Sequence, residues 1–505
     1  MRRVEWLLDK IRQSTDNEDP AVQTAGLSDD ELIEALNDAQ EYLQQELEQI
    51  NAPALETGSN IKNLTALPWC SIDNDDSRDL DQLTACEVLP KGGMRIFVAV
   101  ADVDALVKKG SAIDNHARLN TTSVYTSACT FPMLPEKLCT DLTSLNPHQD
   151  RMALVTAMDF SDDGVLFNSA IYRAVVRNKV QLAYDAVSAW IEGDANLPVT
   201  ATQIVGMDHQ LRLQDALAQK LRVIRRSQGS LEFETFQPKA SFEGERITEI
   251  KLQPQNRARQ LIEEFMIVTN GCIAQFLASH GGPSLRRVVR SPEGWLRIVE
   301  VAKHYGASLP HKPDGKALEN FLARQHKADP LRFPDLSLVI IKLMGSGEYV
   351  VEKPHGPKLG HFALAVKDYM HSTAPNRRFP DLITLRLLKA ALAGEKAPYT
   401  VSELNELAAH CTAQEDAAQK IERQVRKSEA ALFLHSHIGQ HFNGLITGNS
   451  SKGVWVRIFE PPAEGRLKGD LPDLSIGDRV RVRLVSTSVE RGFIDFVIAN
   501  ELRPG

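Results

Sequence analysis

Apolar residues in the first 60 positions recur at helical spacing. Ser28 and Glu31 are three residues apart and match a helix capping box. After them, apolar side chains return every three or four positions up to Leu43. Residues 51–59 carry Pro and Gly and are typical of a linker. Residues 1–60 are therefore predicted to form a small helical accessory domain, with a helix-turn-helix as an alternative.

The hydrophobic pattern of residues 61–437 contains both strand-like apolar runs and segments of helical period. Residues 94–101 and 154–160 are short apolar runs, which predict buried strands. Longer patterns of helical period predict helices at 256–279, 296–305 and 413–437. We therefore expect one large mixed α/β domain here.

Residues 438–505 contain several short strand patterns bounded by turn residues, which predict a small OB-fold β-barrel. Arg479, Arg481 and Arg483 alternate with valines, so one face of a strand carries three guanidinium groups. Such a face suits single-stranded nucleic acid, with Trp455 or Phe459 stacking on bases. A solvated arginine stripe with core aromatics is the alternative. The whole chain is predicted to be a multidomain α+β protein.

The formal net charge of −8 is unevenly distributed. Of 66 acidic and 58 basic residues, 14 and 4 lie in residues 1–60, which leaves 52 and 54 in the remainder. The acidity argues against direct nucleic-acid binding by residues 1–60. The near-neutral remainder allows it, because local patches of charge decide binding.

Six cysteines are present, without a C-x-x-C pair, so neither a zinc site nor a disulfide framework is expected. No apolar run of 18 residues suggests a membrane span, and the charged N-terminus does not resemble a signal peptide. These features favour a cytoplasmic protein.

Five carboxylates crowd into nine residues between Asp73 and Asp81. Crowded carboxylates repel one another unless a cation neutralises them, and hard oxygen ligands favour Mg²⁺ or Mn²⁺. Asp79 and Asp81 share one face of an extended chain, and a turn allows Asp73 to join them.

Two other interpretations compete for this aspartate loop. A calcium loop of the EF-hand type is excluded, because Arg78 stands where Gly is needed and Thr84 where Glu is needed. A solvated acidic loop without metal remains open on these residues alone.

The aspartate loop resembles the catalytic loop of the ribonuclease II/ribonuclease R family, whose catalytic unit is the RNB domain. Further segments resemble that family in the same order: residues 98–103, 110–114, 122–125, 131–139, 142–146, 182–187, 262–267, 360–365 and 369–382. Residues 477–496 resemble an S1-type RNA-binding barrel. The resemblance thus runs through the large α/β domain and continues into the barrel.

The resemblance implies processive hydrolysis of single-stranded RNA from the 3′ end to nucleoside 5′-monophosphates, with Mg²⁺ (or Mn²⁺). It implies that Asp73, Asp79 and Asp81 bind metal or activate water, and that Arg377 stabilises charge on the scissile phosphate. Gln82 occupies a further metal-ligand position.

The resemblance also implies contacts to RNA. Tyr184 is expected to stack on the terminal base, Tyr125 to contact the 3′ end, and Phe233 to stack at the mouth of the channel. Either Glu263 or Glu264 is expected to bind ribose hydroxyls. The remaining candidates are Glu429, for a similar role, and Arg378, for which an ion pair with Asp381 is the alternative.

Two departures from the family pattern leave the function open. The family carries Asp where this chain has Gln82, so a metal is expected to bind more weakly, or Asp75 or Asp76 to replace the ligand. Residues 1–60 also lack the β pattern of the cold-shock barrels found in relatives. The alternatives are an RNA-binding protein that does not hydrolyse RNA, and an endonuclease. Protein partners cannot be inferred.

Overall fold

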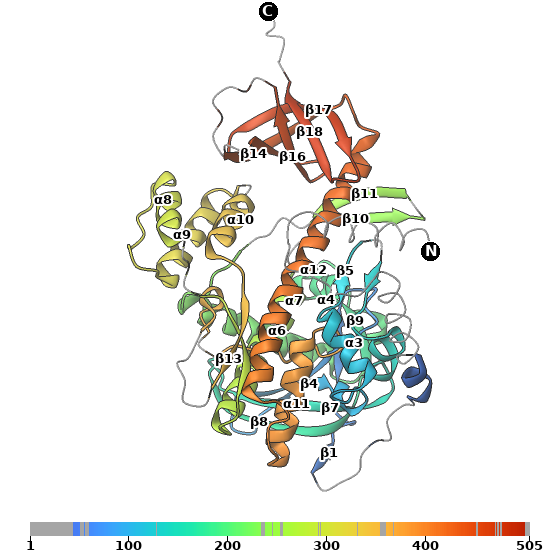
Figure 1. The fold of residues 1–505 in the computed structure, drawn as a ribbon. Coiled ribbons are helices and arrows are strands. Elements are labelled where there is room, and N and C mark those ends of the chain that lie inside the picture. Colours follow the sequence, from blue (N-terminus) through green and yellow to red (C-terminus); the bar gives the residue numbers. More distant parts are fainter. Residues whose placement is uncertain are drawn as a thin grey trace, which may run out of the picture.

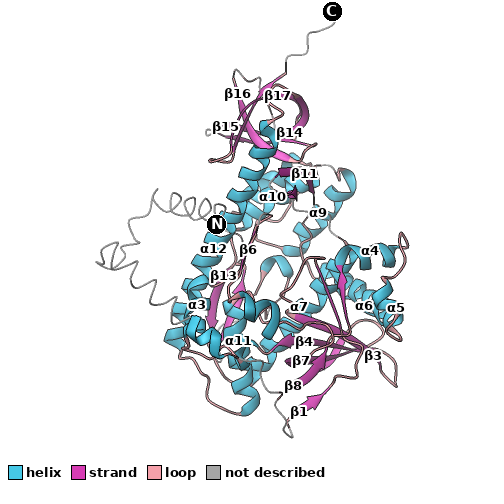
Figure 2. Ribbon diagram, turned by 90° about the vertical axis from the view of Figure 1, so that its right-hand side faces the viewer, coloured by secondary structure: helices cyan, strands magenta, loops and turns pink. Residues whose placement is uncertain are grey.

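A seven-stranded mixed sheet forms the centre of the larger part of the chain in a computed structural model (Figures 1 and 2). The structure describes residues 44–50, 55 and 60–499, apart from short gaps at 128, 234–237, 245, 253–255, 291, 293, 331, 354–359, 367, 451–452, 470, 472–473 and 475–476. In spatial order the strands are β1 (Ile61–Asn63), β8 (Leu166–Arg177), β7 (Asp150–Phe160), β4 (Met94–Ala101), β3 (Gln82–Val88), β2 (Cys70–Asp73) and β9 (Val180–Ala183).

Helices cover both faces of the sheet, and β4 shows why its sequence is apolar throughout. Ile96 and Val98 pack into a core with α4 (Tyr184–Glu192), α5 (Val199–Thr202), α6 (Met207–Ser227) and α7 (Arg257–Ser279). Phe97 and Ala99 point the other way, toward α3 (Ala112–Asn120) and α11 (Phe379–Ala393). A strand buried on both faces carries no polar alternation. The predicted strands at 94–101 and 154–160 are confirmed.

Helix α7 is long and apolar enough to meet the length and composition of a membrane-crossing helix. Most of its apolar residues are nevertheless buried in the two cores that flank the sheet. Asn256 caps it by accepting a hydrogen bond from the Arg259 N–H, which places its start where the sequence predicted. Its composition therefore reflects burial inside the domain.

Smaller units surround the sheet, and the helical group and one hairpin lie above it in Figure 1. Helices α8 (Trp295–His304), α9 (Gly315–Ala328) and α10 (Phe333–Met344) share a hydrophobic core of their own. The hairpin of β10 (Pro238–Glu243) and β11 (Arg246–Leu252) lies beneath the C-terminal barrel. A second two-stranded sheet joins β12 (Ser284–Val288) to β13 (Glu348–Glu352).

The longest helix, α12 (Val401–His435), links the large domain to the barrel. The sequence prediction that it begins at residue 413 was wrong. Thr400 and Glu403 form a capping box that starts the helix 12 residues earlier. Its 35 residues span about 52 Å at 1.5 Å per residue. Its last turns pack Ala431 and Leu434 into the barrel core.

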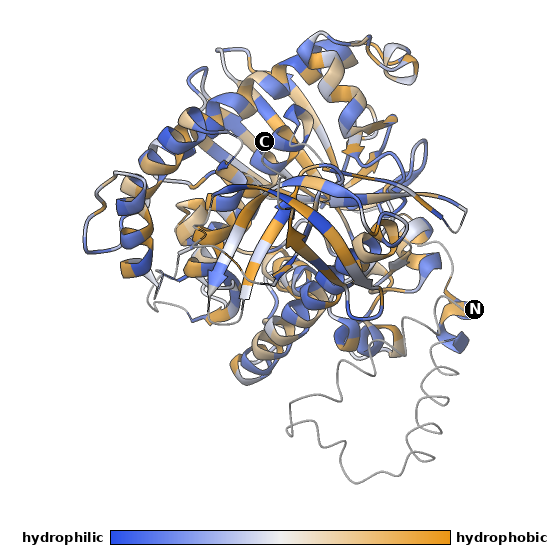
Figure 3. Cartoon of the chain, turned by 90° about the horizontal axis from the view of Figure 1, so that it is seen from above, coloured by the Kyte–Doolittle hydropathy of each residue, from blue (hydrophilic) through white to orange (hydrophobic). Residues whose placement is uncertain are grey.

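The C-terminal strands close into a barrel in the order β14 (His441–Ser450), β15 (Gly453–Ile458), β16 (Ala463–Lys468), β18 (Phe493–Ile498) and β17 (Arg479–Ser488). The barrel is seen from above in Figure 3, where strands alternate between apolar and polar positions. The predicted OB-type barrel is confirmed. Strand β16 was not predicted, and its inward positions include Gly465, where a Cβ would lie 2.6 Å from the Phe496 ring.

The predicted helical domain at residues 1–60 overlaps the described residues mainly at its C-terminal end. Residues 44–49 are helical, and Leu47 and Ile50 pack against the core of the large domain. The capping signal at Ser28 lies outside the described residues, as does nearly all of the predicted linker at 51–59.

Candidate active site

The aspartate loop connects the end of β2 to the start of β3. Asp73 is the last residue of β2, and Gln82 is the first residue of β3. The two strands are hydrogen-bonded neighbours, with Cys70 opposite Thr84. The loop between them therefore returns Asp79 and Asp81 to the same edge of the sheet that carries Asp73.

Asp81 is the buried centre of this edge, with 2% of its surface exposed. Its Oδ2 accepts a hydrogen bond from Arg377 Nε at 2.8 Å, and its Oδ1 accepts one from the Asn376 backbone N–H at 3.1 Å. The pKa of Asp81 is raised to about 7, mainly by burial and also by the negative charge of Asp79, although Arg377 opposes the shift. The structure thus brings together Asp81 and Arg377, which are 296 residues apart in sequence.

The two other aspartates lie beside this pair. Asp79 accepts a hydrogen bond from the Tyr125 hydroxyl at 2.7 Å. Asp73 accepts one from the Asn74 backbone N–H at 2.7 Å. Burial raises the pKa of Asp73, and the negative charge of Asp79 adds to the shift. The negative charges of these carboxylates therefore repel one another and raise the pKa of Asp73 and Asp81.

Tyr125 and Tyr184 flank the aspartates. Tyr125 ends β5 (Val124–Tyr125), which pairs with β6 (Thr130–Phe131), and 41% of its surface is exposed. Tyr184 begins α4, and the Arg259 guanidinium lies 4.5 Å from its ring centre. Arg259 also donates to the Asn74 side-chain oxygen at 2.7 Å, which ties Tyr184 to the aspartate loop.

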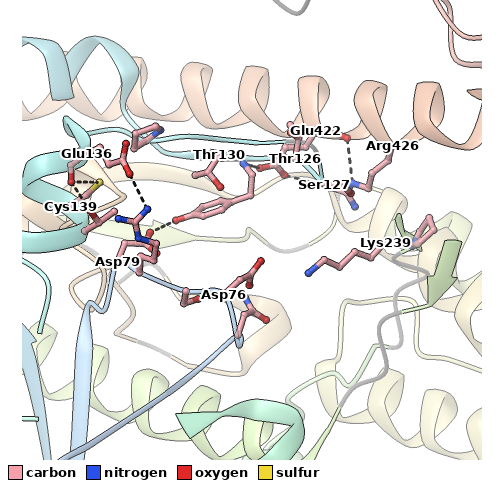
Figure 4. Close-up of a pocket in the computed structure, with 17 residues that line it drawn as sticks. Asp76, Asp79, Thr126, Ser127, Thr130, Glu136, Cys139, Lys239, Glu422 and Arg426 are labelled. Atoms are coloured by element: carbon pink, nitrogen blue, oxygen red, sulfur yellow. Dashed lines mark hydrogen bonds and ion pairs between the residues drawn. The ribbon is translucent and has the colours of Figure 1, made fainter. Parts of the chain in front are cut away.

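A pocket of about 540 Å³ opens beside Asp79 and Tyr125 (Figure 4). Its walls are the aspartate loop, the β5–β6 hairpin, strand β10 and helix α12. Its charged lining residues are Asp76, Arg78, Asp79, Glu136, Lys239, Glu422 and Arg426. Of these, the sequence prediction named only Asp76 and Asp79 as site residues; Lys239, Glu422 and Arg426 come from distant segments that meet only in the folded chain.

Phe233 and Glu263, two predicted RNA-binding residues, line a second, small pocket of about 70 Å³. Glu264 also lines it, but this residue is buried and accepts hydrogen bonds from Arg225 through both carboxylate oxygens. The structure therefore does not place these three residues in the pocket beside Asp79. Their contacts to RNA stay a prediction.

Arg378 and Glu429 also make contacts within the protein. Arg378 donates to Asp381 at 2.8 Å, which is the ion pair given as the alternative to RNA binding. Glu429 accepts a hydrogen bond from the Ser127 hydroxyl at 3.1 Å and does not line the pocket of Figure 4. Instead, Glu422, two turns earlier on α12, lines it and binds the Tyr125 backbone N–H at 3.0 Å.

Comparison with known proteins assigns this architecture. Residues 61–394 match the RNB domain family, and residues 440–499 match the RNase II-type exonuclease C-terminal S1 domain. The chain belongs to the RNB-domain family. The family resemblance and the fold class expected from sequence are thereby confirmed.

Curated relatives and solved structures agree with this assignment. Ribonuclease R of Escherichia coli (strain K12) is 32% identical over 480 residues, covering 88% of this chain and 58% of the relative. Ribonuclease R of Aquifex aeolicus is 32% identical over 467 residues, covering 86% and 64%. The chain thus spans about three fifths of the length of these relatives.

Two solved structures share the fold. The apo form of Mycoplasma genitalium RNase R matches with a TM-score of 0.82 at 22% identity, covering 91% of this chain and 75% of that one. Yeast Ssd1, described as a pseudonuclease, matches with a TM-score of 0.69 at 17% identity, covering 86% and 54%.

A divalent ion is implied by the RNB family, and the donor set can be tested against it. The carboxylate oxygens of Asp73, Asp79 and Asp81, with the amide oxygen of Gln82, are the donors that Mg²⁺ or Mn²⁺ prefers, so the chemistry fits. Over the described ranges, however, no three acidic, His or Cys side chains gather closely enough to hold a metal. The metal-ligand assignment of the four residues stays a prediction.

Proposed function

We propose that the protein is a processive 3′→5′ exoribonuclease that hydrolyses single-stranded RNA to nucleoside 5′-monophosphates with Mg²⁺ or Mn²⁺. The observation that carries this proposal is the contact of Asp81 with Arg377 beside a polar pocket, in a chain of the RNB family. The proposed ligands are Asp73, Asp79, Asp81 and Gln82. A divalent ion there supplies charge neutralisation and lowers the pKa of water.

The residues of the chain account for the other parts of the reaction. A water oxygen attacks the last phosphodiester, the bond from phosphorus to the 3′ oxygen breaks, and that oxygen takes a proton. Arg377 has five N–H donors, of which one binds Asp81, and 38% of its side chain is exposed. It can therefore stabilise the negative charge that grows on the phosphate oxygens.

Tyrosines and arginines account for substrate binding without sequence preference. The exposed ring of Tyr125 lies beside Asp79, where the 3′ end would lie, and Tyr184 offers a π surface to the last base. On the barrel, Arg479, Arg481 and Arg483 all point outward from β17, which we call the arginine stripe. Asn443 and His441 of β14 lie opposite Arg481 and Arg483 in register. This surface would hold phosphates upstream of the 3′ end.

A second candidate function is RNA binding without hydrolysis. Two observations favour it: Gln82 replaces a charged ligand, and a pseudonuclease shares the fold.

All six cysteines are free, which is consistent with the proposed cytoplasmic location.

Incubation of 5′-labelled RNA with Mg²⁺ separates the candidates. A ladder of shortened RNA with nucleoside 5′-monophosphate as product supports the exonuclease, and full-length RNA that stays bound supports the binding protein. Cleavage of a circular RNA would show an endonuclease. Asp81→Asn should abolish shortening with RNA affinity retained, whereas Asp163→Asn, in the exposed β7–β8 turn, should leave both unchanged.

A further inference from the structure

The β10–β11 hairpin packs against the barrel and helix α12. Ala240, Ile247 and Ile250 are buried, and they belong to the same hydrophobic core as Leu434 of α12 and the barrel strands. Six registered residue pairs join the two strands. The backbone positions on the other face of this hairpin are therefore set relative to the pocket.

Lys239 is on that other face, because neighbouring strand residues point to opposite sides and Ala240 points into the core. It lines the pocket, and Figure 4 shows its ammonium group directed into the pocket toward Asp76. Its backbone belongs to a wall opposite the aspartate loop. A chain that reaches Asp79 through this pocket passes within reach of Lys239.

The three basic residues that line the pocket differ in their carboxylate partners. Arg78 is bound by Glu136 at 3.0 Å, and Arg426 is bound by Glu422 at 3.5 Å. Across the part of the chain that the structure describes, no carboxylate forms an ion pair with Lys239. The two other basic lining residues are already neutralised by the protein, so Lys239 offers the positive charge that a phosphate can use.

We propose that Lys239 binds a phosphate of the RNA strand where the strand passes between the hairpin and the aspartate loop. The inference rests on the proposed function and names a contact within that site. Lysine suits this position because its ammonium is a compact charge with three donors on a flexible stem, so it holds a phosphate whatever the base. The pocket lining holds four carboxylates against three cations, so a phosphate there depends strongly on this one charge.

Lys239→Gln tests the inference, with Lys251→Gln as the matched control. Lys251 lies directly opposite Lys239 in the hairpin register, but it does not line the pocket, and it binds Glu249 at 2.8 Å. RNA affinity is measured in EDTA with a single-stranded RNA at 50 and 200 mM salt, and kcat and KM are measured with Mg²⁺.

Loss of one phosphate contact should reduce the slope of log affinity against log salt by about 0.7. The affinity advantage of the wild type over Lys239→Gln should therefore shrink about 2.6-fold between 50 and 200 mM salt. KM should rise with kcat unchanged, because the contact lies away from the scissile phosphate. Lys251→Gln should match the wild type in RNA affinity at both salt concentrations, in kcat and in KM.

An unchanged salt slope and KM in Lys239→Gln would overturn the inference, and so would an equal effect in Lys251→Gln. A fall in kcat with unchanged affinity would also overturn it, because Lys239 would then act on the chemistry. Failure of the wild type to shorten RNA would remove the proposed hydrolysis alone, since the binding measurements in EDTA would still decide the role of Lys239.

Discussion

Replacing Asp335 by Leu would remove the carboxylate that pairs with the buried guanidinium of Arg457. Asp335 is in the first turn of α10 and Arg457 is in β15, so their contact joins the helical group to the barrel. The Arg457 Nη2 lies 2.8 Å from Asp335 Oδ2, and the two side chains are 6% and 8% exposed. Burial raises the pKa of Asp335 to about 6 although Arg457 opposes the shift.

Because the pKa of Asp335 is raised, removing Asp335 and removing Arg457 should change the free energy of unfolding by different amounts. At 2.8 Å the attraction is about 6 kcal/mol for an effective dielectric constant of about 20, but removing each ion from water costs several kcal/mol. Asp335 can become neutral by taking a proton, whereas Arg457 stays charged. Asp335→Leu should therefore cost about 3–5 kcal/mol, and Arg457→Met less. The double variant should be neutral or more stable by about 1–4 kcal/mol.

Urea unfolding at pH 5 and pH 8 measures these free energies, and hydrogen exchange in α10 and β15 localises the loss. A carboxyl with a raised folded pKa stabilises the fold most at low pH, and this contribution is lost as pH rises through the folded pKa. Arg457→Met should thus lie close to the wild type at pH 5, where Asp335 is largely neutral in both, and fall below it at pH 8. Additive losses in the double variant would refute the reasoning, as would equal costs for the two single variants.

Three further predictions concern the site and the barrel. Gln82→Asp should lower the Mg²⁺ concentration needed for half-maximal hydrolysis and Asp76→Asn should raise it; an unchanged metal dependence in both variants would remove Gln82 and Asp76 from the metal site. Tyr125→Phe, which deletes the hydrogen bond to Asp79 but keeps the ring, should change the length of the final RNA product while retaining affinity, as sequencing gels would show. Neutralising the arginine stripe with three Gln substitutions should reduce the salt slope of RNA binding by about 2, and an unchanged slope would place the RNA on another face.

Elements with a strong local pattern could be predicted from sequence. Strand β4 is a continuous apolar run, and α7 combines a helical period with the Asn256 cap. The start of α12 was missed although its capping box, Thr400 and Glu403, is visible in the sequence. Strand β16 could not be found by hydrophobicity, because its inward positions include Ala463 and Gly465, which fit the narrow barrel by being small.

The candidate site was predictable where one short segment carries the chemistry. Asp79 and Asp81 are neighbours in the loop, so their proximity follows from the sequence. The contact of Arg377 with Asp81 was expected only from the family resemblance, because nothing local links residues 296 positions apart. Lys239 and Glu422 were not found, since their place in the pocket depends on how β10 and α12 pack against the aspartate loop.

The charges around the pocket argue for a separation between holding RNA and cutting it. Arg78 and Arg426 are engaged with Glu136 and Glu422, and Arg377 shares its charge with Asp81, so among the described residues Lys239 is the main cation of the pocket that a phosphate can bind at rest. The arginine stripe lies exposed on the barrel at the far end of α12. Affinity should thus come mainly from the barrel and rate from the aspartate edge. An RNA too short to reach the barrel should be hydrolysed with a higher KM at a similar kcat, and its KM should be unaffected by neutralising the stripe. An equal rise in KM for short and long RNA in that variant would show that the stripe acts through the fold of the barrel.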